Sequence, residues 1–182
     1  MQPRQGWVAL CLPQGTPPTL WQAAFPPDIQ ARIVSTANRA GDITNSDLEQ
    51  AGVLGQADVA ASLFDLWELM LATVNDNMAA VSRNRKGAVT SDQATAYLCR
   101  LSSLHRRHHR YYHEVSHIKG LVNAMADFLS RRFDLMDAEL LTYFDTHFPQ
   151  DMPWRLCHLP PATHSMLISA LQRQTPDTAS WL

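Results

Sequence analysis

The chain has 182 residues and a formal net charge of −2, with 15 Lys and Arg residues against 17 Asp and Glu residues. This length is typical of one domain with one core, and the charge balance excludes a generally basic nucleic-acid coat protein. Three distant cysteines argue against a disulfide framework, and no apolar run suits a membrane span or a signal peptide, so we expect an intracellular protein, cytoplasmic or nuclear.

The first 42 residues predict a hairpin followed by an irregular segment. Residues 7–12 (WVALCL) and 19–25 (TLWQAAF) are rich in aromatic and aliphatic side chains, and PQGTPP between them is a strong turn signal. Pro26 and Pro27 end the hairpin. Residues 28–42 fit a short helix followed by a loop.

A helix is predicted to begin near Thr44, Asn45 or Ser46, since each of these side chains can cap a helix N-terminus. Asp47 and Glu49 follow in the first turn, where the helix dipole favours negative charge. We interpret Asp47 as part of the cap. The buried stripe of this helix would consist of Leu48, Ala51, Val53, Leu54 and Val59.

Residues 67–77 (WELMLATVNDN) predict a buried strand with a continuous apolar core that ends in Asn75-Asp76-Asn77. A carboxylate at the C-terminal tip of a buried strand is well placed to hold a metal, because the strand fixes it while the tip stays open. The alternative interpretation of the same three residues is a plain Asx turn.

Two helices with basic ends are predicted next, over residues 77–87 and 92–110. Cations gather at helix C-termini because the dipole favours them, but the same residues would also suit the phosphates of a nucleic acid. The neighbouring His105, His108 and His109 are interpreted as a solvated basic face. The basic residues of the two helices are Arg83, Arg85, Lys86, Arg106, Arg107 and Arg110.

Residues 111–118 (YYHEVSHI) predict a strand that contains the zinc-protease pattern H-E-x-x-H at His113–His117. That pattern works on a helix, where residues four apart lie on one face. On a strand the two imidazoles are roughly 13 Å apart and cannot share one zinc ion. A zinc protease is therefore the least favoured interpretation.

The segment from His117 to Arg132 (HIKGLVNAMADFLSRR) predicts a short loop after Gly120 and then an amphipathic helix that starts near Asn123, with Asp127 one turn into it. The same segment resembles the end of the ribonuclease H domain in reverse transcriptases of retroelements such as retrotransposons. In that family a pattern like H-x-P-G-x-x-N-x-x-A-D-x-L-S-R carries the last metal-binding carboxylate. Lys119 replaces the usual Pro, and the matching residues are His117, Gly120, Asn123, Ala126, Asp127, Leu129, Ser130 and Arg131. Asp47-Leu48-Glu49 looks like the motif that brings the second catalytic Glu, and Asn75-Asp76-Asn77 looks like the family's D-N strand end.

The resemblance covers roughly residues 5–132 and implies an α/β fold, a ribonuclease H-like mixed sheet flanked by helices. Residues 1–133 would form this domain, with an incomplete first strand. Residues 134–182 would form a helical C-terminal tail, with helices predicted near 134–149 and 164–173, and would correspond to the following segment of a polyprotein. The neighbouring reverse transcriptase domain would be a partner in the ancestral polyprotein.

The resemblance also implies a chemistry, namely hydrolysis of the RNA strand of RNA–DNA hybrids with two Mg²⁺ or Mn²⁺ ions. Glu49, Asp76 and Asp127 would be the metal ligands and catalytic carboxylates. His117 would assist proton transfer or product release, or would be structural. The nucleic acid would contact Asn77 and the basic residues of the two helices.

One departure from the family concerns its first catalytic Asp. The family places this Asp several residues before a segment that resembles Gly6-Trp7-Val8, but here no carboxylate precedes Asp28. We therefore expect the isolated chain to be inactive or nearly so as an endonuclease. The alternative is a non-catalytic module with the same fold that binds nucleic acid or another partner.

Overall fold

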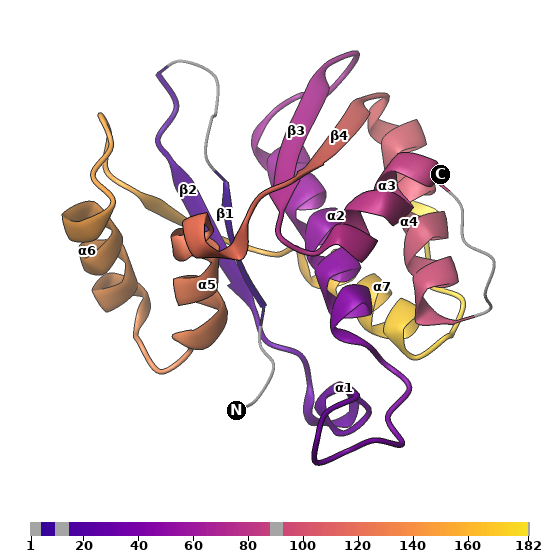
Figure 1. Ribbon diagram of the computed structural model, residues 1–182. Helices are drawn as coiled ribbons and strands as arrows, with labels where there is room; N and C mark the ends of the chain where they lie inside the picture. Colours follow the sequence, from indigo (N-terminus) through magenta and orange to yellow (C-terminus); the bar gives the residue numbers. More distant parts are fainter. Residues whose placement is uncertain (1–4, 10–14, 88–92, 182) are drawn as a thin grey trace.

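The computed structural model describes residues 5–9, 15–87 and 93–181, which form a mixed α/β structure (Figure 1). Its strands are β1 (Gln5–Ala9), β2 (Thr19–Ala23), β3 (Met70–Asn75), β4 (Tyr112–His117) and β5 (Arg155–His158). Its helices are α1 (Pro27–Ala31), α2 (Asn45–Leu63), α3 (Met78–Lys86), α4 (Ala94–His109), α5 (Ala124–Arg131), α6 (Asp137–His147) and α7 (Pro161–Leu171), with 3-10 turns η1 (Gly120–Val122) and η2 (Ala179–Trp181). None of the described helices combines the length and apolarity needed to cross a membrane.

Helix α2 lies at the centre of the structure and packs on β1, α3, α4 and α7. Thr44 is its N-cap, and a capping box joins the Thr44 and Asp47 side chains to the opposite backbone N–H groups. This arrangement confirms the predicted helix start and the capping role of Asp47. Gly55 allows close packing on β2, because an added Cβ would lie 2.7 Å from the ring of Trp21.

The described strands form two separate sheets. β1 and β2 pair antiparallel, as predicted for the hairpin, and β5 joins β2 in parallel. Residues 10–12 of the first predicted strand lie outside the described residues. β3 and β4 form a parallel pair with Met70 opposite Tyr112 and Asn75 opposite His117. The resemblance implies a single mixed sheet, but the described strands form two sheets. Among the described residues, β3 does not pair with a strand of the hairpin.

The sheet β1–β2–β5 is covered on both faces, because side chains alternate across a strand. Trp21 of β2 packs into the main core with residues of α2 and α7. Leu20 points to the opposite face and packs with Leu129 of α5 and Phe144 of α6. The amide of Gln22 donates to the carbonyl oxygen of Leu129 at 2.7 Å, which fixes α5 over this sheet.

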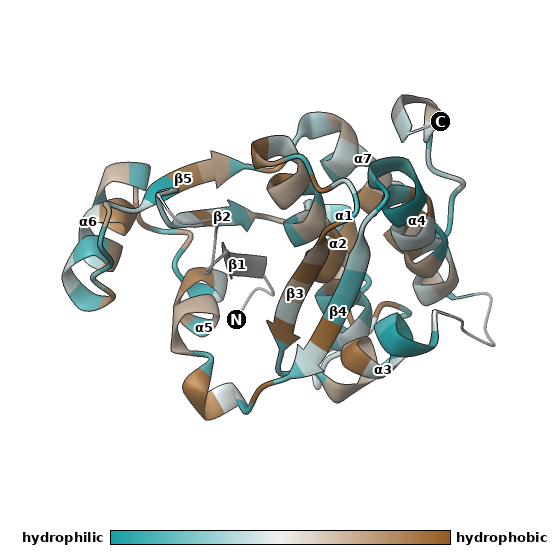
Figure 2. Cartoon of the chain, turned by 90° about the horizontal axis from the view of Figure 1, so that it is seen from above, coloured by the Kyte–Doolittle hydropathy of each residue, from teal (hydrophilic) through white to brown (hydrophobic). Residues whose placement is uncertain are grey.

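Strand β3 is buried on only one face, so the prediction of a buried strand is wrong for its other face. Thr73 and Asn75 are buried, whereas Met70 and Val74 on the other face are exposed. Figure 2 shows the apolar run of β3 beside the more polar β4. The sequence run is apolar on both faces, but within the described residues only one face of the two-stranded sheet is packed on helices.

Residues 134–181 contribute to the same cores as the residues before them. The predicted helices are present as α6 and α7, and β5 between them pairs with β2. Leu171 of α7 is fully buried in the main core, together with Trp181 near the C-terminus. Pro161 occupies the first turn of α7, where proline is compatible with a helix. The remaining predicted helices are confirmed as α1, α3, α4 and α5.

Candidate functional site

The C-terminal ends of β3 and β4 bring several of the predicted site residues to one edge of the molecule. Because the two strands are parallel and in register, Asn75 and His117 lie side by side at their ends. Asp76 is exposed directly after β3. A Cβ added to Gly120, in the connection from β4 to α5, would lie 3.4 Å from Asp76 Oδ2. The strand ends therefore place Asp76 beside the segment that follows His117.

Glu49 reaches the same edge from the N-terminal part of α2. Its Oε2 atom accepts a hydrogen bond of 3.2 Å from the side-chain amide of Asn75. Asn75 is almost completely buried, and its Oδ1 atom accepts from the backbone N–H of Asn77 at 2.7 Å. Asn75 thus fixes Glu49 relative to the strand end. The sequence interpretation did not assign Asn75 a role, although it belongs to the Asn75-Asp76-Asn77 motif.

The carboxyl group of Glu49 is electrostatically unusual. Burial, together with the nearby negative charge of Asp76, raises the pKa of Glu49 to about 7, although the hydrogen bond from Asn75 opposes this shift. Protonation or a bound cation relieves the repulsion between a buried carboxylate and a second carboxylate beside it. Glu49 and Asp76 therefore interact electrostatically and are candidate oxygen ligands for a cation.

Asp127 lies in the first turn of α5, as predicted, but it does not join the other two carboxylates closely. Its side chain is half-exposed and pairs with Arg131 one turn later, with an Oδ1–Nη2 distance of 2.6 Å. Among the described residues, Glu49, Asp76 and Asp127 do not form a group with ligand atoms all within 4.8 Å of one another. The structure brings together two carboxylates and leaves the third on a neighbouring helix.

Asn77, predicted to contact nucleic acid, is the N-cap of α3. Its Oδ1 atom accepts hydrogen bonds from the backbone N–H groups of Ala79 and Ala80, and from the hydroxyl of Ser46. These contacts connect the start of α3 to the start of α2. They give Asn77 a structural role at the edge of the site.

The predicted basic residues lie in two groups along the β3–β4 sheet. In α3, Arg83 pairs with Asp47, while Arg85 donates to the carbonyl oxygen of Val115 and is 3.6 Å from Glu114. Lys86 is exposed at the end of the same helix.

The second basic group is at the C-terminus of α4. Arg110 pairs with Glu68 at 2.7 Å and stacks over Trp67, immediately before β3 begins. Arg106 donates to the carbonyl oxygen of Ser102, and Arg107 is exposed. This group therefore lies at the opposite end of β3 from Asp76, about 20 Å away along a strand of this length.

The pattern His113–His117 lies on β4, which confirms the predicted strand. His113 is buried, and its Nε2 atom forms a 2.9 Å hydrogen bond with the hydroxyl of Thr73. Burial lowers the pKa of His113 to about 4, with further lowering by Arg106 and His105. His117 is exposed at the strand end. The extended backbone excludes the helical geometry that a zinc protease needs.

Comparisons with known proteins give no match for this chain among family models, curated proteins or solved structures. Functional inference therefore depends on the side chains of the chain itself, and above all on the pair Glu49 and Asp76.

Proposed function

We propose that this chain is a ribonuclease H-like domain that binds RNA–DNA hybrids, with a divalent cation held by Glu49 and Asp76 at the scissile phosphate. The observation that carries the proposal is the coupled pair of carboxylates at the end of a parallel strand pair. Glu49 is held there by the buried Asn75 amide, and Asp76 remains open to a ligand.

The donor set suits one Mg²⁺ or Mn²⁺ ion. Both ligands are hard carboxylate oxygens, and Mg²⁺ is commonly held by one or two carboxylates, several waters and a substrate phosphate. The raised pKa of Glu49 supports this assignment, because a bound cation would offset the repulsion between the two carboxylates. When bound, the ion would polarise the phosphate and lower the pKa of a coordinated water.

The two basic groups would position the duplex along the sheet. Arg85 and Lys86 on α3 would contact phosphates near the carboxylate pair, and Arg107 would contact phosphates near the start of β3. A duplex that follows the strands would reach both groups. Hydroxyl groups at the 2′ position of the RNA strand would supply selectivity for the hybrid.

We further propose that hydrolysis by this chain is slow. Asp127, the third carboxylate implied by the resemblance, is paired with Arg131. A site with two convergent carboxylates supplies fewer ligands than the two-ion site implied by the resemblance. His117, exposed at the end of β4, would assist proton transfer or product release.

Fluorescence anisotropy of a labelled RNA–DNA hybrid tests the proposal, with Mg²⁺ compared with EDTA at constant ionic strength. We expect Mg²⁺ to tighten binding several-fold, and Glu49→Gln and Asp76→Asn to remove that gain. Asp151→Asn is the matched control, since Asp151 is exposed far along the chain. Equal affinity in Mg²⁺ and EDTA would contradict a cation at the carboxylate pair.

A non-catalytic nucleic-acid-binding module is the second candidate. It is favoured by the ion pair between Asp127 and Arg131, which removes an expected metal ligand without affecting the basic residues. This module would bind hybrid with a strong salt dependence that Glu49→Gln and Asp76→Asn leave unchanged. Rapid Mg²⁺-dependent cleavage that Asp76→Asn abolishes would instead indicate a complete hydrolytic site.

A further inference from the structure

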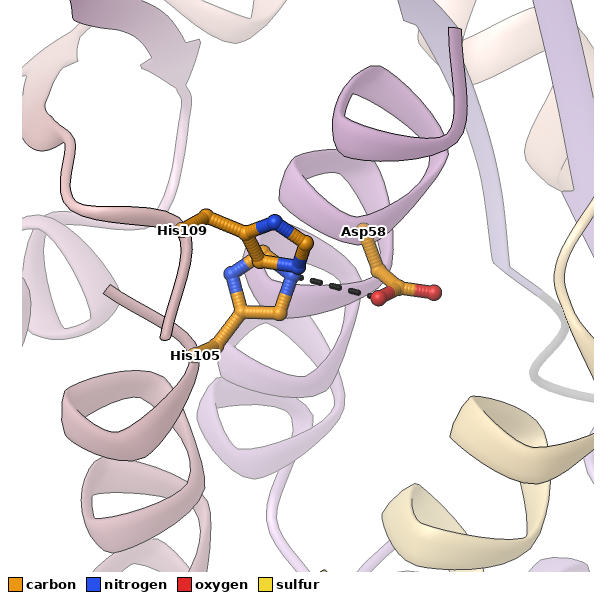
Figure 3. Close-up of side chains that lie close together, drawn as sticks. All are labelled: Asp58, His105 and His109. Carbon is orange, nitrogen blue, oxygen red and sulfur yellow. Dashed lines mark hydrogen bonds and ion pairs between the residues drawn. The ribbon is translucent and has the colours of Figure 1, made fainter. Parts of the chain in front are cut away.

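A second group of ionisable side chains lies away from the carboxylate pair, between α2 and the end of α4. It consists of Asp58, His105 and His109 (Figure 3). Among the described residues, this is the group of three potential metal ligands whose ligand atoms all lie within 4.8 Å of one another. Asp58 and His105 are buried, and His109 is half-buried.

This location corrects the interpretation of His105 and His109 as part of a solvated basic face, whereas His108 is exposed as expected. His105 is fully buried, because it continues the buried stripe of α4 that includes Leu98 and Leu101. The helical spacing of these positions was visible in the sequence. His105 was nevertheless predicted to face solvent because histidine is polar.

The distances within the group approach those of a zinc site. His105 Nε2 and Asp58 Oδ1 are 3.1 Å apart, and the ring centroids of His105 and His109 are 4.4 Å apart. Ligand atoms around a tetrahedral zinc ion lie about 3.3 Å from one another, given zinc–ligand bonds of about 2 Å. His109 is the last residue of α4, so a small rotation of its side chain would complete the approach.

Neighbouring side chains orient the two buried ligands. The Nδ1 atom of His105 forms a 2.9 Å hydrogen bond with the hydroxyl of Tyr111. The hydroxyl of Thr163 donates to Asp58 Oδ2 at 2.6 Å. His105 Nε2 and Asp58 Oδ1 are themselves joined by a 3.1 Å hydrogen bond, which a bound zinc ion would replace. The contacts with Tyr111 and Thr163 would remain as the supporting hydrogen bonds of the two ligands.

The group of Asp58, His105 and His109 is buried on the side of Asp58 and His105 and partly exposed at His109. The ring of Trp181 packs edge-on against His105 with a centroid distance of 5.0 Å. His109 is partly exposed and gives a route from solvent. Burial and the adjacent His105 and His108 lower the pKa of His109 to about 4.

We propose that Asp58, His105 and His109 bind one zinc ion, with a water molecule as the fourth ligand. Two imidazoles and one carboxylate are a ligand set that zinc accepts. The ion would link α2 to α4 and, through Thr163, to α7. The ion would stabilise the packing of these helices, with its water molecule on the side of the partly exposed His109.

Zinc titration of the 182-residue chain after chelator treatment tests this site. Binding is followed by calorimetry and by the visible absorption of Co²⁺ in place of zinc. We expect one ion per chain, a higher melting temperature with zinc, and tetrahedral Co²⁺ bands. His109→Ala should weaken zinc binding at least tenfold while the protein stays folded, since His109 is half-exposed. His147→Ala, at the exposed end of α6, is the matched control.

The site must also be distinguished from the carboxylate pair. The double variant Glu49→Gln/Asp76→Asn is expected to retain the zinc stoichiometry and the Co²⁺ bands. Equal zinc affinity of the wild type and His109→Ala, or loss of zinc binding in the double variant, would overturn the proposal. Absence of any zinc-dependent change in the melting temperature would also overturn it.

Discussion

Two carboxylates on one helix, Glu49 and Asp58, have opposite surroundings. Glu49 lies near the N-terminal end of α2 beside Asp76, with one amide donor from Asn75. Asp58, about 13 Å further along the helix axis, accepts from Thr163 and lies 3.1 Å from His105. A buried carboxylate beside another negative charge is stabilised when a cation binds. A buried carboxylate that accepts hydrogen bonds instead stabilises the packing of the helices that carry the donors. This difference is the basis of the binding role that we propose for the first region and of the structural role that we propose for the second.

Asp58→Ala should have the largest effect on stability. It leaves the Thr163 hydroxyl and the His105 imidazole without their partner in a buried region, which costs about 3 kcal/mol of unfolding free energy. Denaturant unfolding would measure the loss, with the exposed Asp151→Ala as control. Glu49→Gln, on the same helix, should cost little because an amide oxygen can still accept from Asn75. Equal losses for Asp58→Ala and Glu49→Gln would remove the distinction between the two regions.

Trp181→Ala should open the histidine group to solvent. Trp181 is buried against His105, so truncation is expected to cost about 3 kcal/mol and to raise the pKa of His109 toward its ordinary value. Thermal unfolding and NMR titration of the histidine rings would measure both effects. Trp67→Ala is the matched control, since Trp67 is 53% exposed and stacks only on Arg110 among its described ring contacts. An unchanged melting temperature in Trp181→Ala would show that the C-terminal segment does not close this region.

The pH dependence of Mg²⁺ affinity should distinguish the carboxylate pair. Glu49 must lose its proton to bind a cation, and its pKa is about 7, so affinity should rise about tenfold between pH 6 and pH 8. Without metal the effect on folding is opposite, because a raised folded-state pKa makes stability fall as the pH rises from about 4.5 to about 7. Calorimetric Mg²⁺ titrations at several pH values would measure the trend, and Glu49→Gln should abolish it. An affinity independent of pH would contradict the role of Glu49.

Features determined by local sequence were predicted well. The cap at Thr44 and Asp47 depends on residues three apart, and the strand at 112–117 depends on its β-branched and aromatic content. The motif Asn75-Asp76-Asn77 was placed at a strand end, and Asp127 in the first turn of a helix. Helix caps, strand ends and helix starts of this kind depend on neighbouring residues in the sequence and not on distant packing partners.

Features that depend on tertiary packing were missed. The four-residue strand β5 (RLCH) exists through its pairing with β2, and no local pattern indicates it. The apolar run of β3 did not reveal that only one of its faces would be covered. Asp58 and His105 come from helices whose polar positions meet only in the folded structure. Whether the three carboxylates lie close together likewise depends on tertiary packing. The order of Glu49, Asp76 and Asp127 in the sequence does not determine it.

The most direct test of the central claim is paramagnetic line broadening by Mn²⁺ in NMR spectra of the protein bound to an RNA–DNA hybrid. Substoichiometric Mn²⁺ should selectively broaden the backbone amides of Glu49, Asp76 and Gly120, and the Glu49→Gln/Asp76→Asn variant should lose this broadening. Broadening centred on Asp58 and His105, or spread evenly over the exposed carboxylates, would contradict a divalent-cation site at the end of β3.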